Sequence, residues 1–218
     1  MRFLITAGPT REPIDPVRYI SNRSSGKMGY AIAEAALAAG HAVTLISGPV
    51  NLDAPPGAQF VSTLTSDEMY DAVHRYASEC DMLVMCAAVA DYKPREVSAT
   101  KIKKRNEHFT LDLIPARDIL ASLPHKDRQF LLVGFAAETN DIEENAAQKL
   151  RAKNCDIIVA NDVSSEDSGM ESDENEVTIF FRNGETGKIS RASKKIIARE
   201  LVKILINSRE KRLTKKMS

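Results

Sequence analysis

The residues near the N-terminus that are best suited to chemistry lie between a short apolar run and an Ala-rich helix pattern. The apolar run ends at Gly8, and Ser24, Ser25 and Gly26 stand immediately before the helix. Such a helix start offers backbone N–H groups and the positive end of the helix dipole to an anion. Asn22 precedes it, and a side-chain amide there can hydrogen-bond a reacting carbonyl or oxyanion. We therefore predict a phosphate site, with an ordinary helix cap as the alternative.

The two common nucleotide-binding signatures do not match this segment. No G-x-G-x-x-G follows the first apolar run, and the second run ends in Ser47-Gly48-Pro49 without a carboxylate for a ribose. Ser25-Gly26-Lys27 lacks the upstream glycine of a P-loop, and Met28 stands where that loop has Ser or Thr. A short-chain-type NAD(P)-dependent reductase and a non-catalytic nucleotide-binding module are kept as alternative functions.

Two further groups of polar residues follow a buried apolar run. Asp91 comes directly after Ala87-Ala88-Val89-Ala90, where it could cap a turn, hold a metal ion or bind a nucleotide. Lys101, Lys103 and Lys104 crowd the polar stretch that comes next. These lysines are typical of a solvated face, and equally of a mobile flap that closes over a triphosphate.

The second half of the chain adds an aromatic residue and a lysine pair. Phe135 ends an apolar run within GFAAET, where its ring could pack on a base or belong to the core. Lys149 and Lys153 are four residues apart, so a helix would place them on one face. They are either surface charges or a pair that reaches the same anion.

Apolar runs alternate with helix patterns, which predicts a doubly wound, mostly parallel α/β sheet of the Rossmann-like kind. The predicted strands are 2–7, 42–47, 59–64, 81–89, 130–135 and 155–160, and the predicted helices are 29–39, 66–79, 117–122, 141–153 and 194–208. Ser66 or Asp67 is expected to cap the second helix. A half-exposed strand at 108–114 and a hairpin at 176–191 around Asn183-Gly184 predict an antiparallel addition to the sheet.

Composition limits the class of protein. The 218 residues carry 30 basic and 30 acidic side chains, so no net field directs the chain to nucleic acid or membrane. Cys80, Cys86 and Cys155 have no metal-ligand spacing and are expected to be free, buried thiols. With no signal peptide and no apolar run of membrane length, we expect a cytoplasmic protein. We expect one domain, 1–207, followed by a disordered basic tail, 208–218.

The motifs ITAGPTREPIDPVRYISNRSSGKMG, AAVADY, KIKK, GFAAET and ANDV occur in this order. Together they resemble bacterial phosphopantothenoylcysteine synthetase over roughly residues 2–206. The resemblance implies a ligase of coenzyme A biosynthesis that joins 4′-phosphopantothenate to L-cysteine. It implies CTP as co-substrate: the pantothenate carboxylate forms an acyl-cytidylate with release of pyrophosphate, and the cysteine amine then displaces CMP. No flavin or NAD is expected.

The resemblance also assigns residues. Asn22 would bind the acyl-cytidylate and promote its reaction with cysteine, Ala88 would contact substrate, and Lys101 would act from a flap at about 92–106. The positions that match CTP contacts are Gly8, Ser24, Ser25, Gly26, Met85, Cys86, Ala87, Asp91, Lys101, Ile114, Pro115, Ala116, Arg117, Phe135, Lys149 and Lys153. The turn Ile114–Arg117 departs from the Lys-Asn-Pro-like sequence of relatives, so its contacts to the base are assigned to the backbone.

Three partners follow from the same resemblance. Mg²⁺ would neutralise the triphosphate, with no ligand residues assigned. A homodimer would form through the antiparallel arm at 107–114 and the hairpin at 176–191, close to the flap. Many relatives are fused to a flavin-dependent phosphopantothenoylcysteine decarboxylase, so association with such a domain is expected.

Overall fold

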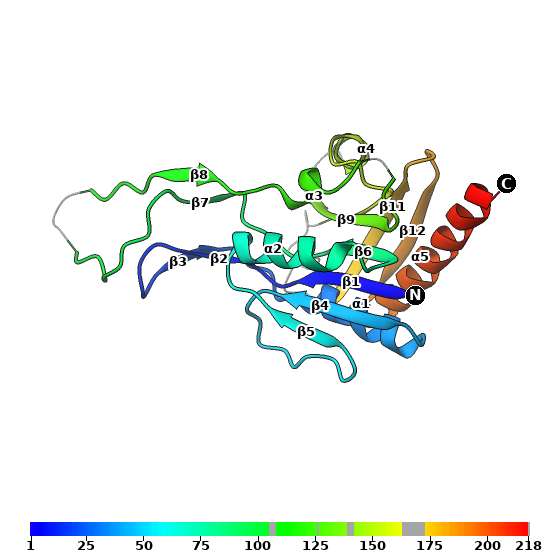
Figure 1. Ribbon diagram of the computed structural model, residues 1–218, viewed down its shortest axis with the longest axis horizontal. Helices are drawn as coiled ribbons and strands as arrows, with labels where there is room; N and C mark the ends of the chain where they lie inside the picture. The colour runs from blue at the N-terminus through cyan, green and yellow to red at the C-terminus, as the bar shows by residue number, and fades with distance from the viewer. Residues whose placement is uncertain (105–107, 126, 139–141, 163–172, 218) are drawn as a thin grey trace.

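Six parallel strands form the centre of the structure, a computed structural model that describes residues 1–104, 108–125, 127–138, 142–162 and 173–217 (Figure 1). They are β1 (Arg2–Ala7), β4 (Ala42–Ser47), β5 (Gln59–Ser62), β6 (Met82–Met85), β9 (Leu131–Glu138) and β10 (Ile157–Asp162). Their spatial order is β5-β4-β1-β6-β9-β10. When these six strands are numbered along the chain, this is the 3-2-1-4-5-6 order of doubly wound sheets. The predicted Rossmann-like fold class is confirmed.

The predicted hairpin extends this sheet. Strand β11 (Glu174–Phe181) pairs antiparallel with β10, and β12 (Thr186–Ser193) pairs antiparallel with β11 at the edge. Gly184 in the connecting turn has a φ of 89°, which the Asn-Gly signal anticipates. The structure lengthens each strand by two residues beyond the predicted range.

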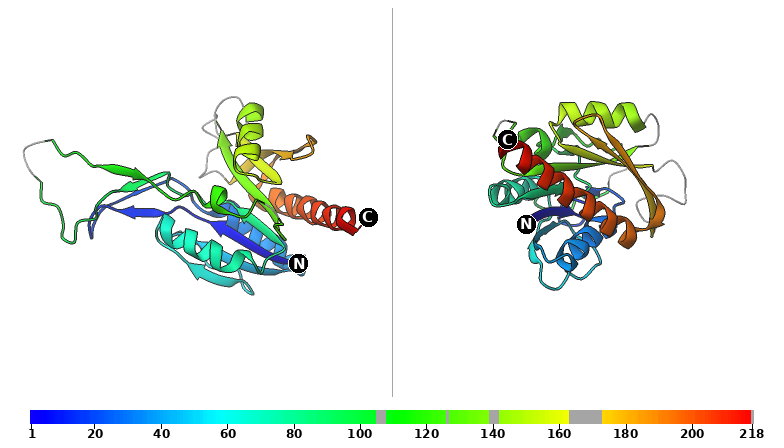
Figure 2. Two further views of the ribbon diagram at one scale, coloured as in Figure 1. Left: turned by 45° about the horizontal axis from the view of Figure 1, so that its top comes forward. Right: turned by 90° about the vertical axis from the view of Figure 1, so that its right-hand side faces the viewer.

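Helices cover both faces of the sheet (Figure 2). The first face carries α1 (Lys27–Ala38) and α5 (Lys194–Met217), and the second carries α2 (Ser66–Ala77), α3 (Ile119–Ser122) and α4 (Ile142–Ala152). Alternate β1 side chains enter the two cores: Phe3 and Ile5 pack with α1 and α5, while Leu4 packs with α2, α3 and α4. Burial on both faces explains why the strands are continuous apolar runs in the sequence.

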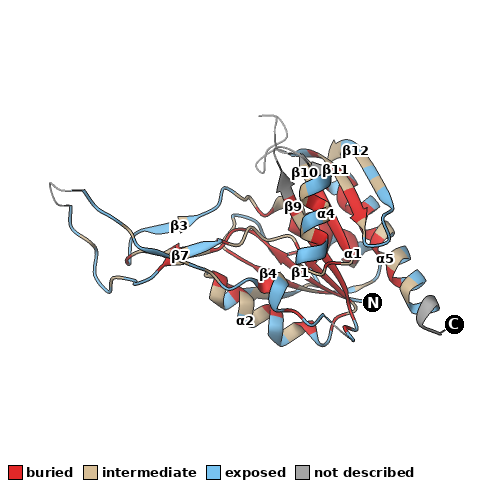
Figure 3. Ribbon diagram, turned by 90° about the horizontal axis from the view of Figure 1, so that it is seen from above, coloured by how far each residue is buried: buried red, intermediate tan, exposed pale blue. Residues whose placement is uncertain are grey.

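Two short antiparallel arms project beyond the carboxyl ends of the parallel strands (Figures 1 and 3). One pairs β2 (Arg11–Pro13) with β3 (Tyr19–Ser21), and the other pairs β7 (Tyr92–Pro94) with β8 (Leu113–Pro115). The sequence prediction treated the first arm as loop. The second arm is antiparallel, as expected, but it forms a separate sheet instead of extending the central one.

The strand predicted at 108–114 is shorter than expected. Only Leu113–Pro115 pairs with β7 as a strand. One further backbone bond, from Arg95 N–H to the Asp112 carbonyl at 3.0 Å, follows, and the Ser98 N–H then donates to the Ile14 carbonyl of the first arm at 3.0 Å. Residues 105–107 of the predicted flap and arm lie outside the described residues.

The first turn of α2 holds the bases of both arms. Its cap is Thr65, whose hydroxyl accepts from Glu68 N–H at 3.2 Å, and not Ser66 or Asp67 as predicted. The cap stands one residue earlier than predicted, so both residues lie inside the first turn of the helix. The Ser66 N–H donates to the buried Glu12 carboxylate of β2 at 2.9 Å, and Asp67 pairs with Lys93 of β7.

The C-terminal tail is helical and not disordered as predicted. Helix α5 continues past Ser208 to Met217, because Arg209 and Arg212 contact the main body. Arg212 Nη1 lies 2.8 Å from the Asp156 carboxylate, and Arg209, which is buried, donates to the Gln129 carbonyl. Within the described ranges, no helix combines the length and apolar character that crossing a membrane requires.

The docking of the end of α5 through Arg212 predicts a specific effect on stability. Replacing Arg212 with Ala removes its bonds to Asp156 and to two backbone carbonyls. We expect the melting temperature to fall by about 3–6 °C, from a loss of roughly 1.5 kcal/mol in a domain of this size. Lys211→Ala, at the exposed neighbouring position, should change it by less than about 1 °C. Equal shifts in differential scanning fluorimetry would mean that the tail does not dock.

Candidate active site

The loops after β1 and β6 meet at the point where the strand order reverses. Sheets of this type bind ligands at that crevice. Pairing continues past both strand ends: Ala88 N–H donates to Gly8 O at 2.9 Å, and Thr10 N–H donates to Ala88 O at 3.1 Å. The Thr10 hydroxyl also accepts from Ala90 N–H at 3.0 Å. The two loops therefore form one fixed edge.

Asn22 is held directly against this edge. Its side-chain amide donates to the Ala88 carbonyl at 3.0 Å, although the two residues are 66 positions apart. The neighbouring Ser21 hydroxyl donates to the Thr10 carbonyl at 2.7 Å, which anchors the end of β3. The structure thus brings together the two residues that the sequence assigned to substrate.

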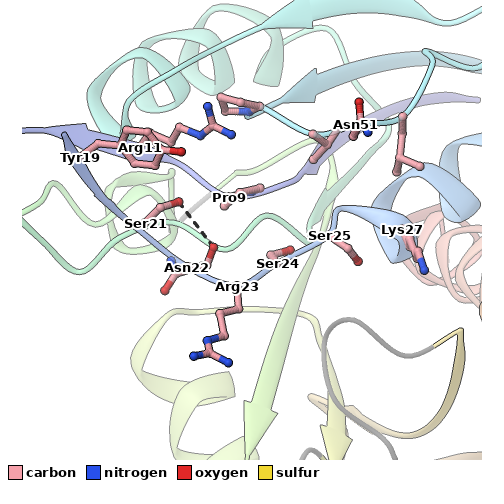
Figure 4. A pocket seen from close by; sticks show the side chains of 13 residues that line it. Pro9, Arg11, Tyr19, Ser21, Asn22, Arg23, Ser24, Ser25, Lys27 and Asn51 are labelled. Carbon is pink, nitrogen blue, oxygen red and sulfur yellow. Dashed lines mark hydrogen bonds between the residues drawn. The ribbon is translucent and has the colours of Figure 1, made fainter. Parts of the chain in front are cut away.

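A cleft of about 930 Å³ opens beside this contact (Figure 4). It is lined by Pro9, Arg11, Tyr19, Ser21, Asn22, Arg23, Ser24, Ser25, Lys27, Pro49, Val50, Asn51 and Leu52. Of the predicted site residues, Asn22, Ser24 and Ser25 line it. Sequence reasoning missed Arg11 and Tyr19, which face each other with the guanidinium 4.7 Å from the ring centre. The Asp15-Pro16 turn signal between them could have revealed their pairing.

The start of α1 forms one wall of the cleft. Its N-cap is Gly26, with a φ of 77°, and among the described residues no side chain caps it and no acid stands in its first turn. The ordinary cap formed by Ser24 or Ser25 is therefore not what the structure has. Instead, Ser24 Oγ accepts from Gly26 N–H at 3.4 Å. Lys27, beside the same helix end, pairs with Asp173 at 2.6 Å. This positive helix end suits a phosphate.

Glycine is required at the cleft for a steric reason. Gly8 has a φ of 72°, and a Cβ there or at Gly26 would lie 2.7 Å from Val50 Cγ1. A side chain at either position would thus be strained and would push on the loop that follows β4.

The other predicted nucleotide-binding residues form a second group around β6, β9 and α4. The Asp91 carbonyl accepts from Ala116 N–H at 2.8 Å, which places Asp91 beside the Ile114–Arg117 turn. Lys149 Nζ donates to the Phe135 carbonyl at 3.3 Å. At Met85–Ala87, the Cys86 and Ala87 N–H groups both donate to the Thr6 hydroxyl at 3.1 Å, so those donors are already used.

Two charged members of this group, Arg117 and Lys153, form ion pairs within the chain. Arg117 lies 2.9 Å from Asp67, and its guanidinium is 3.9 Å from the Tyr70 ring centre. Lys153 pairs with Asp118, the N-cap of α3. Burial alone would raise the pKa of Asp118, but the bonds from Lys153 and from a backbone N–H hold it below its usual range. An incoming nucleotide would have to compete for Lys153 with this carboxylate.

Lys101 is exposed on the second arm and does not line the cleft. The structure therefore does not unite it with Asn22 within one chain.

All three cysteines are free, and burial raises the pKa of Cys80 and of Cys86 to about 12 and that of Cys155 to about 11. They are protonated at neutral pH and unsuited to nucleophilic catalysis. In the described part of the chain, no three His, Cys, Asp or Glu side chains gather as metal ligands.

Comparison with known proteins gives concordant matches. The family described as "DNA/pantothenate metabolism flavoprotein C-terminal domain" matches residues 1–208. The coenzyme A biosynthesis bifunctional protein CoaBC of Vibrio parahaemolyticus is 50% identical over 186 residues, covering 84% of this chain and 47% of that protein. The chain thus spans about half the length of the curated relatives it matches.

Solved structures agree with this match. The crystal structure of the C-terminal domain of a CoaBC protein is 41% identical, with a TM-score of 0.82 and 96% of each chain covered. A Cab2 variant in complex with phosphopantothenate-cysteine is 17% identical, covers 100% of this chain and 89% of its own, and has a TM-score of 0.78. The second likeness supports the fold alone.

The role of Gly26 can be tested against a glycine of similar conformation. Gly40 has a φ of 80°, but no described atom lies within 4 Å of a Cβ built there. Ala at Gly40 should cost about 1 kcal/mol of unfolding free energy, from strain alone. Ala at Gly26 should cost roughly 1 kcal/mol more, and Val50→Ala in the same chain should recover that excess. Urea unfolding measures all three; equal costs at the two glycines would contradict the crowding at the cleft.

Proposed function

Because the chain belongs to the family of DNA/pantothenate metabolism flavoprotein C-terminal domains, we propose that it joins 4′-phosphopantothenate to L-cysteine in coenzyme A biosynthesis, with CTP as co-substrate. The observation that carries the proposal is the Asn22–Ala88 contact, which lies at the switch point and beside the start of α1, where we propose that phosphate binds. The name of the 50% identical relative, a coenzyme A biosynthesis protein, supports it.

The first half-reaction activates the carboxylate. An oxygen of the 4′-phosphopantothenate carboxylate attacks the α-phosphorus of CTP, and the bond from that phosphorus to the β-phosphate breaks, releasing pyrophosphate. The start of α1, with Ser24, Ser25 and Gly26, binds phosphate through its N–H groups and dipole. Lys101 supplies positive charge to the transferring phosphate.

The second half-reaction forms the amide. The cysteine amine attacks the acyl carbon, the carbonyl oxygen gains negative charge, and CMP leaves as the C–N bond forms. The amine must also lose a proton in this step. Asn22 lies at the cleft wall, where its amide can donate to the developing oxyanion. Its bond to Ala88 O holds the amide in place before the substrate arrives.

The second group of residues would hold the nucleotide. Phe135 lies within β9, and the Asp91–Ala116 contact lies beyond the end of β6. Lys149 on α4 donates to the Phe135 carbonyl, and Lys153 follows the end of α4. Mg²⁺ would neutralise the triphosphate as pyrophosphate leaves. The described residues form no three-residue metal cluster, so the phosphates themselves would supply most of its ligands.

A homodimer would complete the site. Several large apolar side chains on the two arms are exposed, among them Val17 at 59%, Val97 at 54% and Phe109 at 62%. Such a patch on narrow arms is typical of a protein interface. Pairing through the arms would bring Lys101 of one subunit toward the cleft of the other. We also propose that the protein acts in the cytoplasm and that it associates there with a phosphopantothenoylcysteine decarboxylase.

One incubation separates the candidate functions. The chain is mixed with CTP, Mg²⁺, 4′-phosphopantothenate and cysteine, and products are scored by mass spectrometry. We expect CMP, pyrophosphate and the amide. Nucleotide binding without turnover would favour a binding module, whereas NADPH binding with no protection by CTP against heat would favour a reductase. Either result would overturn the proposal, and ATP in place of CTP tests the choice of nucleotide.

Asn22→Asp should separate the two half-reactions. A carboxylate cannot donate to the oxyanion, so amide formation should slow by about 100-fold while the acyl-cytidylate accumulates. Rapid-quench mass spectrometry measures both species, and the melting temperature verifies folding. Amide formation at the wild-type rate would show that Asn22 has no such role.

Lys101→Gln should block the earlier step. Loss of the positive charge should reduce pyrophosphate release by about 100-fold or more. Lys203→Gln, on the exposed side of α5, serves as the control and should retain wild-type release. A coupled pyrophosphate assay reads both variants. Unchanged release by Lys101→Gln would exclude the flap lysine from the first half-reaction.

A further inference from the structure

The turn of the first arm contains a carboxylate that is unusually well enclosed. The Asp15 side chain is 0% exposed, although the arm projects from the body of the protein. Its Oδ1 accepts from the backbone N–H groups of Val17 and Arg18, each at 2.9 Å. These two bonds shape the turn between β2 and β3.

The other oxygen of Asp15 reaches across to the second arm. Oδ2 accepts from Arg18 Nε at 3.0 Å and from the backbone N–H of Ile102 at 3.1 Å. Arg18 Nη2 in turn donates to the Ile102 carbonyl at 2.7 Å. One ion pair therefore binds both backbone polar groups of Ile102, a residue 87 positions away.

The charge distribution supports a firm contact. The Arg18 guanidinium, followed by the backbone donors, holds the pKa of the Asp15 carboxyl well below its usual range, although burial acts in the opposite direction. The carboxylate is thus ionised at neutral pH. A buried charge persists only where several donors compensate for its lost hydration, and Asp15 has them from both arms.

Ile102 directly follows Lys101, so this contact has a functional consequence. We propose that Asp15 is a positioning residue that fixes Ile102 and thereby sets where Lys101 is presented. The inference rests on the role proposed for Lys101 in the first half-reaction. Among the described residues, one further backbone bond joins the two arms, from the Ser98 N–H to the Ile14 carbonyl at 3.0 Å, four residues before Ile102. Of the bonds between the arms that the described residues form, those of Asp15 and Arg18 to Ile102 are therefore the nearest to Lys101 in the sequence.

Asp15→Asn distinguishes this role from a local one in the turn. The amide oxygen can still accept from Val17 N–H and Arg18 N–H, so the turn is kept. The new NH₂ group, however, faces the Ile102 N–H and the Arg18 guanidinium, which are both donors. The substitution is therefore selective for the contact between the arms.

Asp112→Asn is the matched control. Asp112 lies on the second arm and pairs with Arg95 at 2.5 Å, but it is exposed and does not touch Ile102. Both variants lose one carboxylate and one ion pair from the arms. Only Asp15→Asn loses the bond to the segment that carries Lys101.

The first measurement does not depend on enzyme activity. Trypsin cleaves after lysine, and mass spectrometry of brief digests reports cleavage after Lys101, Lys103 and Lys104. For Asp15→Asn we expect this cleavage to be about fivefold faster or more than in the wild type, since opening of the segment governs access. Asp112→Asn should match the wild type. Should Asp15→Asn not fold, Arg18→Ala, which keeps the Asp15–Ile102 bond, should show a smaller but measurable increase.

The second measurement is pyrophosphate release with CTP and 4′-phosphopantothenate. We expect kcat to fall by about tenfold to 100-fold in Asp15→Asn, with KM for CTP within about twofold, because misplacement of a catalytic group affects the reacting step. A merely structural role would leave kcat unchanged once the protein is folded. Wild-type cleavage and wild-type kcat in Asp15→Asn would each overturn the inference. Absence of pyrophosphate release by the wild type would instead overturn the proposed function. The ratio of the trypsin cleavage rates of Asp15→Asn and the wild type would then still test whether Asp15 fixes Ile102.

Discussion

The carbonyl oxygen of Ala88 accepts two hydrogen bonds, from the Thr10 backbone at 3.1 Å and from the Asn22 side chain at 3.0 Å. The candidate site depends on this shared acceptor. It joins the loop after β1, the loop after β6 and the segment after β3, and it adds to the bonds that Gly8, Ala90 and Ser21 make at the same edge. A carbonyl oxygen has two lone pairs, so it can serve both donors without leaving either unsatisfied.

The arms depend on similar contacts, because a hairpin of three-residue strands is not stable by itself. Each arm is fixed at its base to the first turn of α2, through Glu12 and through Lys93 with Asp67. The bond from Lys93, followed by that from Arg117, holds the pKa of Asp67 below its usual range, although burial opposes the shift. Near their tips, Asp15 and Ile102 join the arms to each other. The two arms therefore form one projecting unit, which is bound to α2 at its base and cross-linked by hydrogen bonds near its tips.

The central sheet could be predicted from sequence because its strands are buried on both faces. The range 2–7 was predicted to the residue, as was 42–47, since continuous apolar runs between turn signals leave little ambiguity. Strands β2 and β3 were missed, because three residues are too few to show a period and Pro13 and Pro16 favour a loop. The end of α5 was missed for a different reason. Its residues are charged, and only the carbonyls and carboxylate that meet Arg209 and Arg212 show that they dock.

The sequence by itself determined the fold class, the family and the candidate residues of the phosphate site, because these depend on local patterns and on motifs that are continuous in the chain. Tertiary structure alone decided which of those residues act together. It placed Asn22 on Ala88, separated Lys101 from the cleft of its own chain, and bound the neighbour of Lys101 to Asp15. The physical reason is that a hydrogen bond requires its two groups to lie about 3 Å apart. For partners 66 or 87 residues apart, that distance is set by the packing of the whole sheet and not by any local period.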